Sequence, residues 1–251
     1  MRLGPIDVFS ESMHSLKGAF SETVYIYGTA IETCLKGLIE NSTAHSPLPA
    51  PRIFSLGLGL GYVEILAAAL ILKTAREFPG IRQTAGGESF EIVPELRDWF
   101  GAWVLGNENS PSSSTPVPEN FQQAYEDILG RTAEQTAISA PEILTQLREM
   151  ILSERWKIRP ALTTSTGFNQ KFQCICFDAF SSKTSPDLWT EEFLTDFFNK
   201  VAADSCVLAT YACTGALKRT LRSAGFELTI RQGFSSKRDS TFAVRGLKSL
   251  S

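Results

Sequence analysis

A strand, a glycine-rich turn and the start of a helix follow one another in Arg52-Ile-Phe-Ser-Leu-Gly-Leu-Gly-Leu-Gly-Tyr62. Gly57, Gly59 and Gly61 carry no side chain, so the backbone of this turn can come close to a bulky ligand. Such a turn before a helix is typical of nucleotide-type cofactor sites, although it is often only a tight connection between strand and helix. Tyr62 stands where a dinucleotide fingerprint has its third glycine, which disfavours a pyrophosphate ligand.

A second landmark is the apolar run Phe172-Gln-Cys-Ile-Cys-Phe177, which predicts a buried strand that ends directly before Asp178. Ligands bind at the carboxyl ends of the strands in open α/β sheets, so Asp178 is a candidate active-site residue. The alternative is that its carboxylate only caps the following turn through backbone amides. Glu91, in another expected strand, is the candidate acceptor for the hydroxyl groups of a ribose.

The wider pattern predicts an α/β fold. Hydrophobic periodicity indicates strands at 52–58, 88–93, 172–177, 206–210, 226–233 and 241–245, and helices at 63–76, 119–129, 141–155, 191–201 and 214–224. Strands that alternate with helices imply a doubly wound, mostly parallel sheet. The last two strands have no helix between them, which implies an antiparallel edge hairpin.

A chain of 251 residues, of which 43% are hydrophobic, can bury a large core, and we expect a single domain over residues 1–251. Stretches rich in proline and serine divide it into parts. These are an N-terminal segment and linker (1–51), a cofactor-binding half (52–105), a loop with a helical insertion (106–160) and a catalytic half with a basic C-terminal hairpin (161–251).

Composition argues against membrane and metal proteins. The longest apolar run (65–72) is far shorter than the roughly 20 residues that span a bilayer, and no leader pattern is present, so we expect a soluble, cytoplasmic protein. The five cysteines form no disulfide-like frame, although Cys174 and Cys176 could share a face of one strand. Because the chain has only two histidines, we expect buried structural thiols and no metal.

The net charge of −3 is unevenly distributed along the chain. Residues 217–251 contain eight basic and two acidic residues, a net charge of +6, which leaves −9 on the rest of the chain. A phosphate-bearing partner would bind such a basic segment on an acidic body. A solvated helix face with charged strand ends explains it equally well.

Several motifs occur in the order in which one protein family has them. The first two are His14-Ser-Leu-Lys-Gly-Ala-Phe-Ser-Glu22, similar to H-S-x-x-G-A-x-x-E, and Ser89-Phe-Glu-Ile-Val-Pro-Glu-Leu96. The most specific is Asp178-Ala-Phe-Ser-Ser-Lys-Thr-Ser-Pro-Asp-Leu-Trp-Thr190, similar to D-x-F-x-P-x-K-N-P-x-x-W-T, and the last is Gly233-Phe-Ser-Ser-Lys-Arg238. On these motifs the chain resembles the methyltransferase half of the bacterial tRNA-modifying enzyme MnmC, especially its stand-alone relatives without the flavin-dependent oxidase half.

This resemblance implies a Rossmann-like class I methyltransferase fold with S-adenosyl-L-methionine as its cofactor. It also implies methyl transfer to the primary amine of a 5-aminomethyl-uridine at the wobble position of tRNA, with the anticodon loop as partner. Asp178 would then be catalytic, by orienting the amine toward the methyl group and taking its proton. The cofactor-binding residues would be Gly57, Gly59, Gly61, Glu91, Glu22 and Asp178.

The resemblance also assigns residues to the RNA. Phe180 and Trp189 are candidates for stacking on the wobble base, although aromatic residues after a turn are more often packed in the core. Lys237 and Arg238 are candidates for contacts with anticodon phosphates, which would make binding sensitive to salt. For Glu22, the alternative to a cofactor or substrate contact is an exposed glutamate on a helix.

The chain also departs from the family pattern. Ser55 replaces an acidic residue before the glycine turn, Val63 replaces an asparagine after it, and Ser182 replaces a proline. Two alternatives therefore stay open: a methyltransferase for a small amine or another RNA, and a non-catalytic module of the same fold that binds RNA or a partner. The sequence leaves the oligomeric state and the need for a separate oxidase open.

Overall fold

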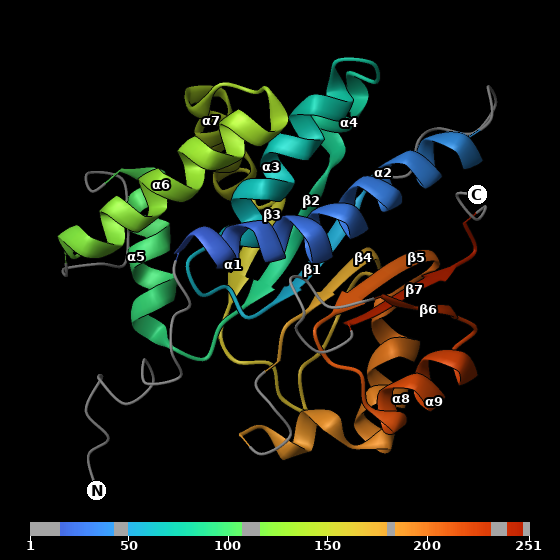
Figure 1. Cartoon of the computed structure of the whole chain (residues 1–251). Helices are drawn as coiled ribbons and strands as arrows, with labels where there is room; N and C mark the ends of the chain where they lie inside the picture. The colour runs from blue at the N-terminus through green and yellow to red at the C-terminus, as the bar shows by residue number, and fades with distance from the viewer. Residues whose placement is uncertain (1–15, 43–49, 107–115, 180–183, 232–239, 248–251) are drawn as a thin grey trace, which may run out of the picture.

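The computed structural model describes residues 16–42, 50–106, 116–179, 184–231 and 240–247, which form a seven-stranded sheet in the order β3-β2-β1-β4-β5-β7-β6 (Figure 1). The parallel strands are β1 (Arg52–Leu56), β2 (Gly86–Phe90), β3 (Trp156–Arg159), β4 (Phe172–Phe177) and β5 (Ala202–Thr210). Strand β7 (Ser240–Arg245) is antiparallel to both β5 and β6 (Glu227–Arg231). The predicted doubly wound, mostly parallel sheet with an antiparallel edge is confirmed.

Helices cover both faces of this sheet (Figure 1). One face carries α2 (Thr29–Asn41) and α3 (Tyr62–Ala75), and around α3 lie α4 (Gly80–Thr84), α5 (Pro94–Leu105), α6 (Glu119–Thr136) and α7 (Ala140–Leu152). The other face carries α8 (Glu191–Val201) and α9 (Gly215–Ser223), with the 3-10 turn η3 (Pro186–Trp189) before α8. At the N-terminal side, α1 (Leu16–Thr23) and the π-helix η2 (Val24–Gly28) run without a break into α2.

Alternate residues of β1 point to opposite faces and supply two cores. Ile53 belongs to the core under α2 and α3, whereas Phe54 packs on the other face with its ring centroid 5.2 Å from that of Phe197. Helix α3 is apolar on all sides because it lies between the sheet and the helices α6 and α7. This packing fixes the start of α3 and, with it, the glycine turn that precedes the helix.

The segment 106–160 contributes more to the fold than a loop and a helical insertion. It supplies β3, which pairs in parallel with β2 at the end of the sheet. Its helices α6 and α7 pack directly on α3, so they belong to the layer that covers the sheet. Helix α5 is also absent from the expected elements, although Pro94 in its first turn is a typical start signal.

Strand β2 begins at Gly86, two residues before its expected start, because the neighbouring strands leave no room for side chains there. A Cβ atom on Gly86 would lie 2.1 Å from the carbonyl oxygen of Arg155, and one on Gly87 would lie 2.3 Å from that of Ile53. Glycine is disfavoured in strands by propensity. Its presence here reflects close backbone packing that a sequence pattern does not reveal.

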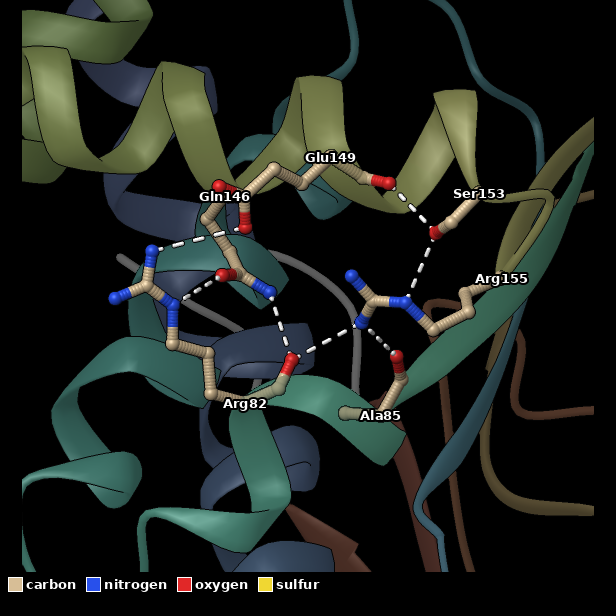
Figure 2. Close-up of polar contacts among 6 residues, drawn as sticks. All are labelled: Arg82, Ala85, Gln146, Glu149, Ser153 and Arg155. Carbon is tan, nitrogen blue, oxygen red and sulfur yellow. Dashed lines mark hydrogen bonds and ion pairs between the residues drawn. The ribbon is translucent and has the colours of Figure 1, made fainter.

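Arginine side chains tie α4, α7 and the beginning of β3 together at the amino ends of the strands (Figure 2). The Nε of Arg82 donates to Gln146 Oε1 at 3.1 Å, and its Nη2 pairs with Glu149 Oε2 at 3.6 Å. Arg155 Nη1 donates to the carbonyl oxygens of Arg82 and Ala85, each at 3.0 Å. These guanidinium groups brace the end of the sheet that lies opposite the glycine turn.

Within the ranges given above, none of the helices is both long and apolar enough to cross a membrane. Nor do these ranges contain a group of three or more histidine, cysteine or acidic side chains that could hold a metal ion. Four cysteines are buried free thiols and Cys213 is half-buried. Their position agrees with the expected role of thiols as small apolar groups.

Candidate active site

The glycine turn after β1 depends on backbone conformations that favour glycine. Gly57, Gly59 and Gly61 have φ angles of +87°, +50° and +70°. A Cβ atom on Gly61 would lie 2.1 Å from Cε2 of Phe100, so a side chain would displace this buried ring. A Cβ atom on Gly59 would meet nothing within 4 Å. The turn therefore packs tightly at Gly61 and leaves open space at Gly59.

A pocket of about 700 Å³ opens at the carboxyl ends of β1, β2 and β4. This volume lies in the range of about 300–1,000 Å³ that is usual for small-molecule sites. The residues that line it come from the glycine turn, the segment after β2, the segment after β3 and the segment between β4 and α8. They include Gly57, Gly59, Leu60, Glu91, Ile92, Val93, Leu162, Thr163, Thr164, Asp178, Ala179, Thr184, Ser185 and Asp187.

Glu91 links the segment after β2 to the glycine turn. Its Oε2 accepts a hydrogen bond from the backbone N–H of Gly59 at 2.9 Å, and its Oε1 accepts one from the N–H of Val93 at 2.9 Å. Each carboxylate oxygen can accept a second hydrogen bond, so a ligand with two neighbouring hydroxyl groups could bind here. Beside it in the pocket wall, the side chain of Ile92 is 59% exposed.

Asp178 lies directly after β4, in contact with the glycine turn. Its N–H donates to the carbonyl oxygen of Leu56 at 3.2 Å, and a Cβ atom on Gly57 would lie 2.9 Å from its carbonyl oxygen. Asp178 is exposed to solvent through the pocket that it lines, although neighbouring protein atoms desolvate its carboxyl group. Burial raises the pKa of Asp178 to about 7 and the charge of Glu22 adds to the rise, whereas the hydroxyl of Tyr27 lowers this pKa. Solvent screens the charge of an exposed carboxylate, and a ligand that displaces the solvent removes this screening.

The N-terminal helix brings two further groups to Asp178. Glu22, in α1, is 8% exposed and lies near enough for its charge to affect Asp178, although it does not line the pocket. Tyr27, in η2, packs edge-to-face on Tyr211 at the end of β5, with ring centroids 5.4 Å apart. Burial raises the pKa of both tyrosines, and the negative charge of Asp178 adds to the rise.

Of the remaining predicted site residues, Trp189 lies in the described part of the chain but not at the pocket. Trp189 is 9% exposed and does not line it, and the indole ring meets Phe177 edge-on with centroids 5.5 Å apart. Stacking of Trp189 on a base stays a prediction, and packing in the core is the alternative that this position favours. Phe180, Lys237 and Arg238 lie outside the described residues.

The pocket also contains residues that the sequence pattern did not indicate. Leu162, Thr163 and Thr164 reach it because they follow β3, a strand of four residues with two polar positions. Ile92 had a usable signal, since it stands directly after the candidate acid Glu91. The approach of Tyr27 to Asp178 joins positions 151 residues apart and has no local signal.

A buried polar network lies behind the glycine turn. Glu64, in the first turn of α3, is fully buried, and its Oε1 accepts a hydrogen bond from Ser89 Oγ at 2.6 Å. Ser89 Oγ in turn accepts one from Trp156 Nε1 at 2.8 Å. The second oxygen of Glu64 and the hydroxyl of Ser55 are buried without a hydrogen-bond partner in the part of the chain that the structure describes. Burial raises the pKa of Glu64 to about 7, and nearby Ser55 and Ser89 lower it.

Replacing Glu64 with glutamine is expected to raise the free energy of unfolding at neutral pH. The pKa of Glu64 rises from 4.5 to about 7 on burial, so between these values the folded chain binds more protons than the unfolded chain. The free energy of unfolding of the wild type therefore falls as pH rises through this window. Glutamine stays neutral, and its amide can donate to Ser55 Oγ. We therefore expect the difference in free energy of unfolding between Glu64→Gln and the wild type to be about 1–3 kcal/mol more favourable to the variant at pH 8 than at pH 5.

Urea unfolding of both proteins at pH 5 and pH 8 measures this difference. Glu134→Gln, a change at an exposed position of α6, is the matched control and should give the same difference from wild type at both pH values. An equal effect of Glu64→Gln at pH 5 and pH 8 would show that Glu64 does not titrate in this window.

Comparison with protein families gives one match over more than half of the chain. Residues 115–246 match a family model described as S-adenosyl-L-methionine-dependent methyltransferase. Two curated relatives carry the name tRNA 5-methylaminomethyl-2-thiouridine biosynthesis bifunctional protein MnmC. The protein from Hahella chejuensis is 37% identical over 67 residues and the one from Ralstonia nicotianae is 41% identical over 67 residues. Each match covers 27% of this chain and 10% of the relative.

Among solved structures, MnmC2 from Aquifex aeolicus is similar to this chain with a TM-score of 0.45 and 19% sequence identity. The similarity covers 85% of this chain and 57% of that chain.

Proposed function

Because the chain belongs to the family of S-adenosyl-L-methionine-dependent methyltransferases, we propose that it methylates the primary amine of a 5-aminomethyl-uridine at the wobble position of tRNA. Membership of the family makes the chain an enzyme with S-adenosyl-L-methionine as its cofactor. The amine and the tRNA are the proposed part. The names of the two curated relatives, which refer to tRNA 5-methylaminomethyl-2-thiouridine biosynthesis, support them.

The pocket fits this cofactor in size and in chemistry. Its volume is about 700 Å³, and the open space at Gly59 leaves room for a ligand against the backbone. We propose that the two oxygens of Glu91 accept hydrogen bonds from the ribose hydroxyls. The exposed side chain of Ile92 offers an apolar surface for the purine ring.

Asp178 would act on the methyl acceptor. The cofactor supplies an electrophilic methyl group, and an amine attacks it only through a free lone pair. Asp178 would accept a hydrogen bond from the amine, orient the lone pair and take the proton that the amine loses. A carboxyl group whose pKa burial raises to about 7 is a suitable base for this step at neutral pH.

One observation carries the proposal: the candidate base touches the candidate cofactor turn. A Cβ atom on Gly57 would lie 2.9 Å from the carbonyl oxygen of Asp178, and both residues line the same pocket. An acceptor amine held by Asp178 would therefore lie beside the ligand of the glycine turn. This proximity is what transfer between two bound molecules requires.

The RNA contacts remain proposals on residues outside the described part of the chain. Phe180 would stack on the extruded wobble base, and Lys237 and Arg238 would bind anticodon phosphates. Extrusion of the wobble base costs less than flipping a base from a duplex, because the base lies in a single-stranded loop. The reaction would take place in the cytoplasm.

The decisive experiment is transfer of labelled methyl from S-adenosyl-L-methionine to tRNA purified from cells that lack the final methylation. Label at the wobble uridine is expected, and the fully modified tRNA of normal cells should accept none. A small primary amine added in excess serves as a competitor and as an alternative acceptor.

The outcomes separate the proposal from its alternatives. Label on the small amine but not on tRNA would identify a small-molecule methyltransferase. Binding of the cofactor without transfer to either acceptor would contradict the proposed substrate, whereas absence of cofactor binding would favour a binding module of the same fold.

A further inference from the structure

The long helix at the N-terminal side changes its winding beside the active site. Val24–Gly28 forms a π-helical turn between α1 and α2, and its residues Ile26, Tyr27 and Gly28 are buried. A π-helical turn inside an α-helix is uncommon and frequently marks a functional site. Here it carries Tyr27, whose ring packs on Tyr211 directly after β5, the strand beside β4 and Asp178.

The hydroxyl of Tyr27 is a buried polar group without a hydrogen bond. The residue is 1% exposed, and no atom of the described residues stands in hydrogen-bonding geometry to its Oη. A buried hydroxyl without a partner destabilises a fold by about 1–3 kcal/mol, so phenylalanine would be the more stable choice at this position. Tyr27 packs on Tyr211, which follows β5, and Asp178 follows the neighbouring strand β4, so the carboxylate is an acceptor on the same edge of the sheet. The charge of Asp178 also raises the pKa of the Tyr27 hydroxyl, after the larger effect of burial.

We propose that Tyr27 is a positioning residue for Asp178: its hydroxyl donates to the carboxylate and keeps it ionised and oriented toward the pocket. The inference rests on the proposed function in that Asp178 is the base for the acceptor amine. The hydrogen bond would stabilise the charged form of the carboxylate when a bound ligand excludes water. The second carboxylate oxygen would remain available to the amine.

The groups around Asp178 make such a donor necessary. Burial and the charge of Glu22, from α1, both oppose ionisation of Asp178, and Tyr27, from η2, is the group that favours it. Tyr211, at the end of β5, faces the same carboxylate, and Cys176, on β4, lies near both tyrosines. Across the pocket, Glu91 and Asp187 add negative charge. Without the Tyr27 hydroxyl, the protonated form of the Asp178 carboxyl group would be favoured.

The test measures the affinity of the chain for S-adenosyl-L-methionine between pH 6 and pH 9 by calorimetry, for the wild type and Tyr27→Phe. Ionised Asp178 attracts the sulfonium, so the wild-type Kd is expected to fall by about three- to tenfold as pH rises through the titration of this carboxyl. Removal of the Tyr27 hydroxyl should move the midpoint of this change upward by about half to one pH unit.

The chain offers a matched control in Tyr125. This residue of α6 is fully buried, its hydroxyl also lacks a partner, and its ring packs among Phe100, Trp103 and Phe121, away from Asp178. Tyr125→Phe should leave the midpoint unchanged. Tyr125→Phe removes an unpaired hydroxyl, so urea unfolding should show stability equal to or above that of the wild type. Urea unfolding of Tyr27→Phe checks that this variant is folded under the conditions of the titration.

Two further measurements test whether the Asp178 carboxyl and the sulfonium of the cofactor cause the pH dependence of the Kd. Asp178→Asn should remove the part of the pH dependence that Asp178 causes, so that adding Tyr27→Phe to it no longer moves the midpoint. S-adenosylhomocysteine, which lacks the positive charge on sulfur, should bind with a much smaller pH dependence than S-adenosyl-L-methionine. A Tyr27→Phe midpoint equal to that of the wild type, or a wild-type Kd that does not change with pH, would overturn the proposal. No methyl acceptor takes part, so failure of the tRNA assignment would leave this result intact.

Discussion

Replacement of Asp178 by asparagine is expected to lower kcat for methyl transfer by about 10²- to 10⁴-fold, the usual contribution of a positioned general base. Asparagine has nearly the same shape, so the close contact with Gly57 and the backbone hydrogen bond to Leu56 should persist. The carboxamide can still accept a hydrogen bond from the amine but cannot take its proton. The loss should therefore appear in kcat at saturating cofactor more than in cofactor affinity.

Single-turnover transfer of labelled methyl, with wild type and Asp178→Asn both saturated with S-adenosyl-L-methionine, measures this effect. Asp196→Asn changes an exposed aspartate on α8 that pairs with Lys200 and should transfer methyl at the wild-type rate. If Asp178→Asn retained kcat within threefold of the wild type, Asp178 would not be the base. Its contact with the glycine turn would then serve only to close the turn.

The sharpest local patterns gave the most accurate predictions. Strand β4 and helix α8 have the expected bounds. A largely apolar run marks β4, and Thr190 caps the start of α8, where its Oγ1 accepts a hydrogen bond from the N–H of Phe193. Such signals lie within a few residues of the element that they define. The mostly parallel sheet with its antiparallel edge followed from them.

Features that depend on tertiary contacts were not predictable. Gly86 and Gly87 lie in β2 because neighbouring backbone fills the space of a side chain, although propensity argues against a strand there. The approach of Tyr27 to Asp178 depends on how the N-terminal helix crosses the sheet. Buried Glu64 behind the turn, where Ser55 replaces the family's acidic residue, likewise emerges only from the packing of α3 on β1 and β2.

Replacement of Glu91 by alanine is expected to raise the Kd for S-adenosyl-L-methionine by about a hundredfold. A hydrogen bond to a charged acceptor contributes about 1.5–3 kcal/mol, and Glu91 would accept two from the ribose. Its carboxylate also holds the N–H groups of Gly59 and Val93, each at 2.9 Å. Alanine would therefore remove both the ligand contacts and the groups that shape the turn around them.

Glutamine at position 91 separates these two contributions. Its amide oxygen can replace one carboxylate oxygen as an acceptor, whereas its NH₂ group opposes the N–H of either Gly59 or Val93, so we expect a loss of about tenfold for Glu91→Gln. Glu88→Ala is the matched control on the same strand. Glu88 pairs with Arg159 at 3.4 Å and accepts from Gln170 at 3.0 Å without lining the pocket, so its loss should change the Kd by less than threefold. Calorimetric titration measures the Kd of each variant for S-adenosyl-L-methionine. If Glu91→Ala and Glu88→Ala had the same Kd, the ribose would bind elsewhere and the assignment of this pocket to the cofactor would be wrong.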